Sequence, residues 1–399
     1  MQILTRRTGV EVELLAPAGH DRLTLATAIA QARGGTVRRT SHTDSEPSLV
    51  PGMGHFWHLT PGFTVHDGDG ALVATLVDDI TLVADLARER EQGTPPRPAP
   101  QDWYRLLSDE PRLLRLVDDH CDPAAPLSEV LGAVAVLFGV DVETVGPVRR
   151  LQDRSGATIA LAAPLPPGRE RPCEIVTPPL VRDHERALED LLAPARDLGF
   201  TIPSEAAVHL HVDAAPFRGA AAFANLVRLF GHWREVLRTA LGTNPACTRL
   251  QPLPAALLDL VDPADGGGSG PLSDWPRLQA AARGTGLTKY YDVNLTALLT
   301  ETPARDTVEV RILPGALHAG AITARAALLE RLLDRCCDPR PLPRPSAGQR
   351  AVSTSGHAVR LLHELASGGA GSEHTRAPQR EPPLGAPGPR AESPRRRRR

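Results

Sequence analysis

Three segments of the sequence place ionisable side chains at alternate positions, with apolar residues between them. Glu11 and Glu13 are two residues apart, so in an extended strand both carboxylates lie on the same face. Val10, Val12 and Leu14 then lie on the opposite face. The same alternation gives two further sets of residues that share a face: His209, His211 and Asp213 in one segment, and Glu309 and Arg311 in another.

The choice of side chains on these faces points to metal chemistry. Like charges that face each other across a sheet are destabilising, so converging carboxylates need a counter-charge. A divalent cation supplies one, and oxygen ligands with an occasional imidazole suit Mg²⁺ or Mn²⁺. The competing interpretations are a solvated polar face for each strand, an internal ion pair between Glu309 and Arg311, and structural histidines.

Strands can present such faces only if helices cover their apolar sides, so we expect an α+β fold. Strands are expected over Gly9–Leu15, Cys173–Thr177, Ala207–Val212, Tyr290–Leu295 and Thr307–Leu313, with hairpins formed by His55–Asp67 with Ala71–Leu76 and within Arg150–Leu165. Helices are expected over Asp21–Arg33, Asp79–Arg90, Trp103–Asp119, Leu127–Phe138, Asp183–Leu198, Arg218–Leu241, Ala319–Arg335 and Val352–Ala366. Loops are expected at Gly93–Pro100 and Gly266–Gly270.

Composition narrows the class of protein. The chain has 399 residues, 41% hydrophobic and 23% charged, which is typical of a globular protein and excludes a coiled coil. Its longest apolar stretch, Val130–Val140, is too short to cross a bilayer, and no signal-peptide pattern opens the sequence. Five cysteines without metal-ligand spacing indicate reduced thiols, and we expect a cytoplasmic protein without a membrane partner. The net charge of −2 is unevenly spread, with −10 over residues 1–339 and +8 over residues 340–399, so a basic surface over the whole protein is not supported and nucleic acid is an unlikely partner. The Arg-rich tail is either a solvated end or an electrostatic arm for an acidic partner or nucleic acid.

Five blocks of sequence, taken in order, resemble the amidoligase family of the glutamine synthetase and glutamate–cysteine ligase (carboxylate–amine ligase) superfamily. The resemblance covers roughly residues 9–335. The blocks are G-x-E-x-E at Gly9–Glu13, E-I-V-T-P-P at Glu174–Pro179, H-L-H-V-D at His209–Asp213, K-Y-Y-D-V-N at Lys289–Asn294 and E-V-R-I-L-P-G at Glu309–Gly315.

The resemblance implies a curved antiparallel sheet of the glutamine synthetase-like catalytic type, with helices packed on its convex face. It also implies ATP- and Mg²⁺-dependent joining of a carboxylate to an amine through an acyl phosphate. The metal ligands implied are Glu11, Glu13, Glu174, His211 and Glu309; the nucleotide-binding residues are His209, His211 and Arg311; the catalytic residues are Arg311, Lys289 and Asn294. Asp44 falls where relatives often carry an acidic residue.

Two departures from the family pattern affect this transfer of roles. Thr177 stands where many relatives have serine, and His209 stands where they often have a small residue, so the roles of His209 and His211 could be exchanged. Three other functions use the same residues: a phosphotransferase on the same scaffold, a metal-dependent hydrolase that does not use ATP, and a nucleotide-binding protein without turnover.

The expected organisation is a catalytic domain at 1–338, with a helical insertion at 102–150, followed by a Pro- and Arg-rich tail at 339–399. Disorder is expected in that tail from about residue 368 onward. The substrates implied are a small-molecule or peptide carboxylate and an amine. A glutamine amidotransferase-like or cyclotransferase-like enzyme is the implied protein partner.

Overall fold

The computed structural model describes residues 4–47, 55–93, 96–100, 102–247, 250–262, 273–303 and 305–368. The expected loop at Gly266–Gly270 and the tail beyond residue 368 lie outside the described residues. No helix in the described ranges is long and apolar enough to cross a membrane.

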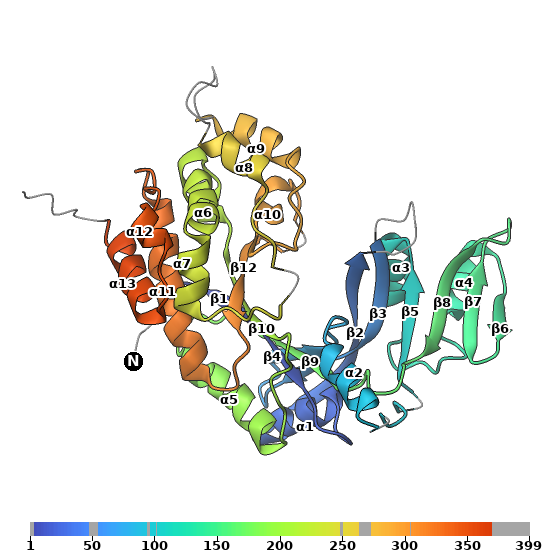
Figure 1. The fold of residues 1–399 in the computed structure, drawn as a ribbon. Coiled ribbons are helices and arrows are strands. Elements are labelled where there is room, and N and C mark those ends of the chain that lie inside the picture. The colour runs from blue at the N-terminus through green and yellow to red at the C-terminus, as the bar shows by residue number, and fades with distance from the viewer. Residues whose placement is uncertain are drawn as a thin grey trace, which may run out of the picture.

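A single open antiparallel sheet of twelve strands organises the chain (Figure 1). Its order is β11-β12-β10-β1-β9-β4-β3-β5-β8-β7-β6, and β2 pairs with β3 off this path. The strands are β1 (Thr8–Leu15), β2 (Thr36–Pro47), β3 (His55–His66), β4 (Leu72–Val77), β5 (Tyr104–Ser108), β6 (Val142–Val145), β7 (Val148–Gln152), β8 (Thr158–Pro164), β9 (Pro172–Val176), β10 (Ala207–Asp213), β11 (Val293–Asn294) and β12 (Thr307–Pro314).

Helices cover the apolar side of the central strands. In Figure 1, α1 and α5 lie below these strands, whereas α8 to α10 and the strands β2 and β3 rise above them. The helices are α1 (Arg22–Ala32), α2 (Ala84–Glu91), α3 (Pro111–His120), α4 (Gly132–Phe138), α5 (His184–Asp197), α6 (Ala220–His232), α7 (Arg234–Leu241), α8 (Ala255–Val261), α9 (Trp275–Arg283), α10 (Thr296–Leu299), α11 (Ala319–Cys337), α12 (Ala347–Arg350) and α13 (Ser355–Ala366). The expected mixed architecture with a large antiparallel sheet is therefore confirmed.

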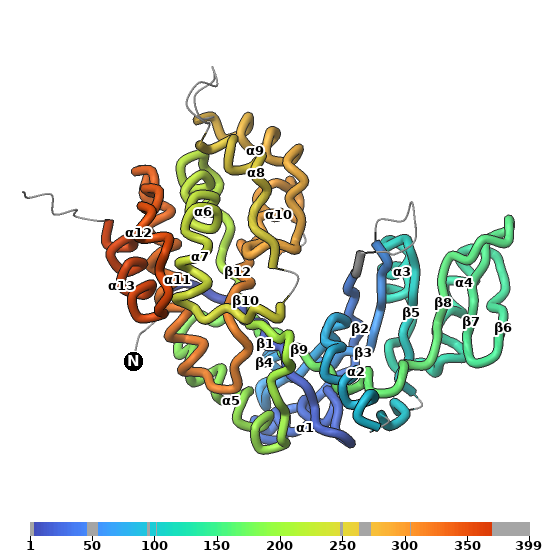
Figure 2. The backbone as a smooth tube through the Cα atoms, in the orientation of Figure 1, coloured from blue at the N-terminus to red at the C-terminus, as the bar shows by residue number. Residues whose placement is uncertain are grey.

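Two hydrophobic cores lie along this sheet. The larger core joins Val10, Val12 and Leu14 of β1 to apolar side chains of α1, α5, α6 and α11. The smaller core belongs to what we call the small lobe, residues 104–164, which forms one end of the molecule (Figure 2). Leu59 of β3 packs in the smaller core, whereas Phe63 of the same strand packs in the larger one. Strand β3 thus connects the two.

A buried arginine fastens α1 to the sheet. Arg22 has no exposed surface, and its guanidinium donates hydrogen bonds to the carbonyl oxygens of Arg169 (2.9 Å) and Pro172 (2.7 Å). It also lies 3.5 Å from the carboxylate of Asp78 and 4.9 Å from the centre of the Trp103 ring. Burial lowers the pKa of Arg22, and the charge of Asp78 opposes that effect. One side chain therefore links the helix to several separate segments.

Two of the expected helices were wrong, and one strand was not expected. The helix expected over Trp103–Asp119 begins only at Pro111, and residues 104–108 form β5. The region 102–150 therefore contains strands as well as helices. The single helix expected over Arg218–Leu241 is divided at Trp233 into α6 and α7. Strand β2 was not expected, because its sequence TVRRTSHTDSEP contains almost no apolar residues. Pairing with β3 along its full length holds it in place.

Candidate functional site

Strand register brings ionisable residues of four strands, together with Asn294 of β11, onto one face of the sheet. Glu11 of β1 is paired with His209 of β10 on one side and with Val176 of β9 on the other. His211 of β10 is paired with Glu309 of β12. Asn294 of β11 is paired with Glu309 of β12. Glu13 of β1 is paired with Glu174 of β9. The side-chain period of two residues then directs these groups to a common space.

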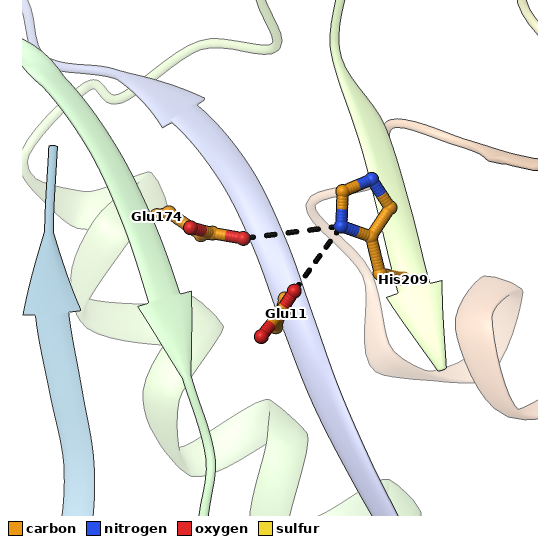
Figure 3. Close-up of side chains that lie close together, drawn as sticks. All are labelled: Glu11, Glu174 and His209. Atoms are coloured by element: carbon orange, nitrogen blue, oxygen red, sulfur yellow. Dashed lines mark hydrogen bonds and ion pairs between the residues drawn. The ribbon is translucent and has the colours of Figure 1, made fainter. Parts of the chain in front are cut away.

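The first cluster consists of Glu11, Glu174 and His209 (Figure 3). Nδ1 of His209 lies 3.2 Å from Oε2 of Glu11 and 3.9 Å from Oε1 of Glu174. Figure 3 shows both carboxylates directed toward the imidazole from β1 and β9. One ligand atom from each residue lies within 4.8 Å of the others, which is close enough to surround one cation.

The second cluster consists of Glu11, His211 and Glu309, so the two clusters share Glu11. Nε2 of His211 lies 3.1 Å from Oε1 of Glu11, and Nδ1 of His211 lies 3.0 Å from the hydroxyl of Thr307. Asn294 donates a hydrogen bond of 2.9 Å to Oε2 of Glu309. Carboxylates and imidazoles suit Mg²⁺ and Mn²⁺, so the donors of either cluster could hold such an ion.

Glu13 lies beside these clusters rather than within them. Its Oε2 accepts a hydrogen bond of 2.7 Å from the backbone of Ala207, and its Oε1 lies 3.4 Å from Nε2 of His209. Burial, together with the neighbouring carboxylate of Asp79, raises the pKa of Glu13 well above its ordinary value. In this arrangement Glu13 supports the orientation of His209.

The carboxylates of the two clusters have pKa values that are shifted in different directions. Burial and the negative charge of Glu11 raise the pKa of Glu174 well above its ordinary value. Burial also acts to raise the pKa of Glu11, but hydrogen bonds with His209 and His211 outweigh it and hold that pKa well below normal. For Glu309 the charge of Arg311 overcomes the effect of burial and lowers the pKa. Glu174 is thus the carboxylate that most lacks a positive partner.

The pKa values of His209 and His211 are shifted in opposite directions. Burial and the charge of Arg311 lower the pKa of His209, which favours a neutral imidazole with a free electron pair. Burial also acts to lower the pKa of His211, but its hydrogen bond with Glu11 outweighs this effect and raises it. His209 is therefore the histidine better prepared to bind a cation without first losing a proton.

Three cationic side chains border the clusters. Arg311 forms a buried ion pair with Glu309, and its Nε is buried with no hydrogen-bond partner within the described part of the chain. Arg305 donates a hydrogen bond of 2.7 Å to Oε1 of Glu11. Nζ of Lys289 lies 3.0 Å from Oδ1 of Asp44. This ion pair connects the segment before β11 to the C-terminal part of β2.

Two adjoining cavities meet at Glu11. The charged cavity, of about 510 Å³, contains both clusters and is lined as well by Asn294, Lys289 and Arg311. The second cavity, which we call the apolar cavity, has a volume of about 550 Å³ and is lined by Leu72, Val176, Pro178 and Pro179, with charged residues such as Arg7, Asp213 and Asp306 at its border. The residues that line both cavities are Glu11, Val176, His211, Arg305 and Thr307.

The structure brings nearly all of the sequence-predicted residues into the charged cavity. Glu11, Glu174, His209, His211, Lys289, Asn294, Glu309 and Arg311 line it, whereas Glu13 lies outside its lining. Among the ionisable residues of the lining, sequence reasoning missed three: His42, Asp79 and Arg305. They lie in β2 or in irregular segments, where no apolar alternation indicates which face a side chain occupies.

Fold and site together define a mixed α/β protein that gathers carboxylates, imidazoles and guanidinium groups on one face of an open antiparallel sheet. A family model described as "Putative amidoligase enzyme" matches residues 4–333, and the chain belongs to that family. The family is one of enzymes with ligase-type activity, so the resemblance indicated by the five sequence blocks is confirmed. No match was found among curated proteins or solved structures.

Replacing Glu174 by glutamine is expected to stabilise the metal-free protein at pH 8. Because the pKa of Glu174 is raised in the folded protein, its ionisation destabilises the fold. The penalty is full above the folded pKa, shrinks as the pH falls below it and is gone below the pKa of the unfolded chain. We expect Glu174→Gln to raise the free energy of unfolding by on the order of 1 kcal/mol at pH 8, with a smaller gain at pH 5. Urea denaturation at both pH values measures this.

The matched control for Glu174→Gln is Glu143→Gln on β6, where the carboxylate is exposed and lies outside both cavities. Its stability should change little at either pH. A loss of stability in Glu174→Gln at pH 8 would show that the carboxylate is held by favourable contacts, contrary to the charge balance described above.

Proposed function

We propose that the protein is an ATP- and Mg²⁺-dependent carboxylate–amine ligase that forms an amide or peptide bond through an acyl phosphate. The observation that carries the proposal is the pair of clusters sharing Glu11 beside the buried guanidinium of Arg311, in a chain of the amidoligase family. We also propose that its open antiparallel sheet is of the glutamine synthetase-like catalytic type. Both ideas are supported by the register that collects the acidic side chains on one face.

Under this proposal the first and second clusters hold Mg²⁺, or Mn²⁺ in its place. Such ions, when bound, neutralise phosphate charge and orient the triphosphate. Arg311 then acts on the group in transfer, because its buried Nε is a donor that still lacks an acceptor in the described structure. A donor held in place before charge develops costs no reorganisation during the reaction.

The two cavities suggest a division of the ligands. We place the triphosphate in the charged cavity and the adenosine in the apolar cavity, whose walls of proline, valine and leucine suit an aromatic base. The acid and the amine then occupy the remainder of the charged cavity. There Lys289 and Asn294 provide hydrogen-bond donors for a carboxylate.

The substrate class proposed is a small-molecule or peptide carboxylate together with an amine, in the cytoplasm. A glutamine amidotransferase-like or cyclotransferase-like enzyme is the proposed partner. These parts of the proposal rest on the family resemblance and on the mixture of cationic and anionic side chains in the charged cavity.

The test is a thermal shift with a non-hydrolysable ATP analogue, with and without Mg²⁺. Binding to the native state alone raises the melting temperature by mass action, even when the other substrates are unknown. We expect a Mg²⁺-dependent rise that EDTA abolishes, followed by ADP release when acids and amines are screened together.

Other outcomes separate the alternatives. ADP release with a phosphorylated product and no amide would indicate a phosphotransferase. A folded protein that shows no shift at millimolar nucleotide would refute the ligase proposal and favour a hydrolase that does not use ATP.

A further inference from the structure

Arg305 occupies the boundary between the two cavities. It lies in the segment between α10 and β12, and its Nη1 is 2.7 Å from Oε1 of Glu11. It lines both the charged and the apolar cavity, although its side chain is 58% exposed. Within the described part of the chain, Glu11 is its hydrogen-bond and ion-pair partner. The guanidinium of Arg305 is therefore bound to Glu11 through Nη1, whereas much of the side chain is exposed to solvent.

The backbone that carries Arg305 is fixed independently of this contact. The neighbouring Asp306 accepts a hydrogen bond of 2.8 Å from Arg218, and its carbonyl oxygen accepts one of 3.1 Å from the backbone of Ala214. The next residue, Thr307, begins β12 and contacts His211. Breaking the bond between Arg305 and Glu11 would thus release a side chain without releasing the segment.

The contact places Arg305 in competition with a bound cation. Oε1 of Glu11, the oxygen that accepts from Arg305, also lies 3.1 Å from the imidazole of His211 in the second cluster. A divalent ion held between these residues would repel a guanidinium on the same carboxylate, since two positive charges a few ångströms apart disfavour each other. Cation binding at this oxygen would therefore weaken the Arg305–Glu11 pair.

We propose that Arg305 is a displaceable counter-ion of Glu11, which moves to the phosphates of the nucleotide when a cation binds the second cluster. The proposal rests on the proposed function for its second half, because the destination is a nucleotide at the junction of the two cavities. In the free protein Arg305 neutralises Glu11; in the loaded protein the same charge binds phosphate. Arg305 would then be a catalytic residue in contact with substrate.

Removing the guanidinium should have two effects of opposite sign. Without its competitor, Mn²⁺ should bind Arg305→Gln more tightly than wild type in the absence of nucleotide, by about tenfold. Without its phosphate contact, the variant should bind the ATP analogue about tenfold more weakly. Its rate of ADP formation from ATP should fall by about 10²- to 10³-fold. A residue that merely holds Glu11 in place would weaken both ligands.

The experiment is a calorimetric titration of Mn²⁺ into wild type, Arg305→Gln and Arg305→Lys, repeated with the ATP analogue in the presence of Mn²⁺. The control is Arg88→Gln on α2, whose exposed guanidinium pairs with Asp85 away from the cavities. Arg305→Lys should resemble wild type in Mn²⁺ affinity, because it keeps the competing charge, but should bind nucleotide less well than wild type.

Tighter Mn²⁺ binding with weaker nucleotide binding in Arg305→Gln supports the exchange. Unchanged or weaker Mn²⁺ binding overturns it. If wild type binds no nucleotide, the ligase proposal fails together with the transfer to phosphate, whereas the titration of Mn²⁺ alone still decides whether Arg305 is the counter-ion of Glu11. The failures of the two proposals are thus distinguishable.

Discussion

Replacing Glu11 by glutamine is expected to lower ADP formation by about 10³-fold or more, a larger loss than any other single change in the charged cavity. Glu11 belongs to both clusters, so its neutralisation removes a ligand from two cation sites at once. It also removes the charge that accepts hydrogen bonds from His209 and Arg305. Calorimetric titration should find Mn²⁺ binding weakened at both sites.

The same variant should still fold, because glutamine keeps the shape of the side chain. Without metal it should be less stable than wild type at pH 7, because the favourable contacts of the Glu11 charge with His209, His211 and Arg305 are lost. Glu143→Gln, an exposed change on β6, should keep full activity and Mn²⁺ affinity. Activity within tenfold of wild type in Glu11→Gln would mean that neither cluster binds a catalytic cation.

The largest expected loss of stability comes from Arg22→Met. This substitution leaves the carboxylate of Asp78, which is 1% exposed, with Arg169 as its remaining guanidinium partner in the described structure. It also leaves backbone carbonyl groups at Arg169 and Pro172 without their donor. Breaking a buried charge network in this way costs about 3–5 kcal/mol. Unfolding in guanidinium chloride, followed by circular dichroism, measures this loss in the free energy of unfolding.

A neighbouring arginine provides the control for this measurement. Arg33 follows the same helix and pairs with Asp190 at 2.9 Å, but both side chains are partly exposed. Arg33→Met should therefore cost less than about 1 kcal/mol. Equal losses in the two variants would contradict the structural role assigned to Arg22.

The face on which the acidic residues lie could be predicted from sequence, because a strand has a side-chain period of two. Glu11 and Glu309 alternate with valines, and the valines are buried in the larger core as the pattern requires. The register between strands could not be predicted in this way, since it depends on partners far away in the chain. Register decides that Glu11, and not Glu13, is shared by the two clusters.

Segments without apolar alternation account for the features that sequence reasoning missed. Strand β2 is held by its pairing with β3 rather than by its own composition. Strand β5 lies in a stretch rich in leucine, where a short apolar run fits a helix or a strand equally well. Arg305 lies in an irregular segment, so its contact with Glu11 depends on the path of the backbone before β12.

The division of the sheet between two cores has a consequence for the cooperativity of unfolding. The pairing between β3 and β5 joins Trp57–Leu59 to residues 106–108, and it is the hydrogen-bonded ladder that links the small lobe to the rest of the sheet. Two units with separate cores and a short common ladder should melt in separate transitions. Because Mg²⁺ and nucleotide would bind to groups on β1, β9, β10 and β12, only the transition of the larger core should move with ligand. The small lobe would then serve as an internal reference within the same calorimetric scan.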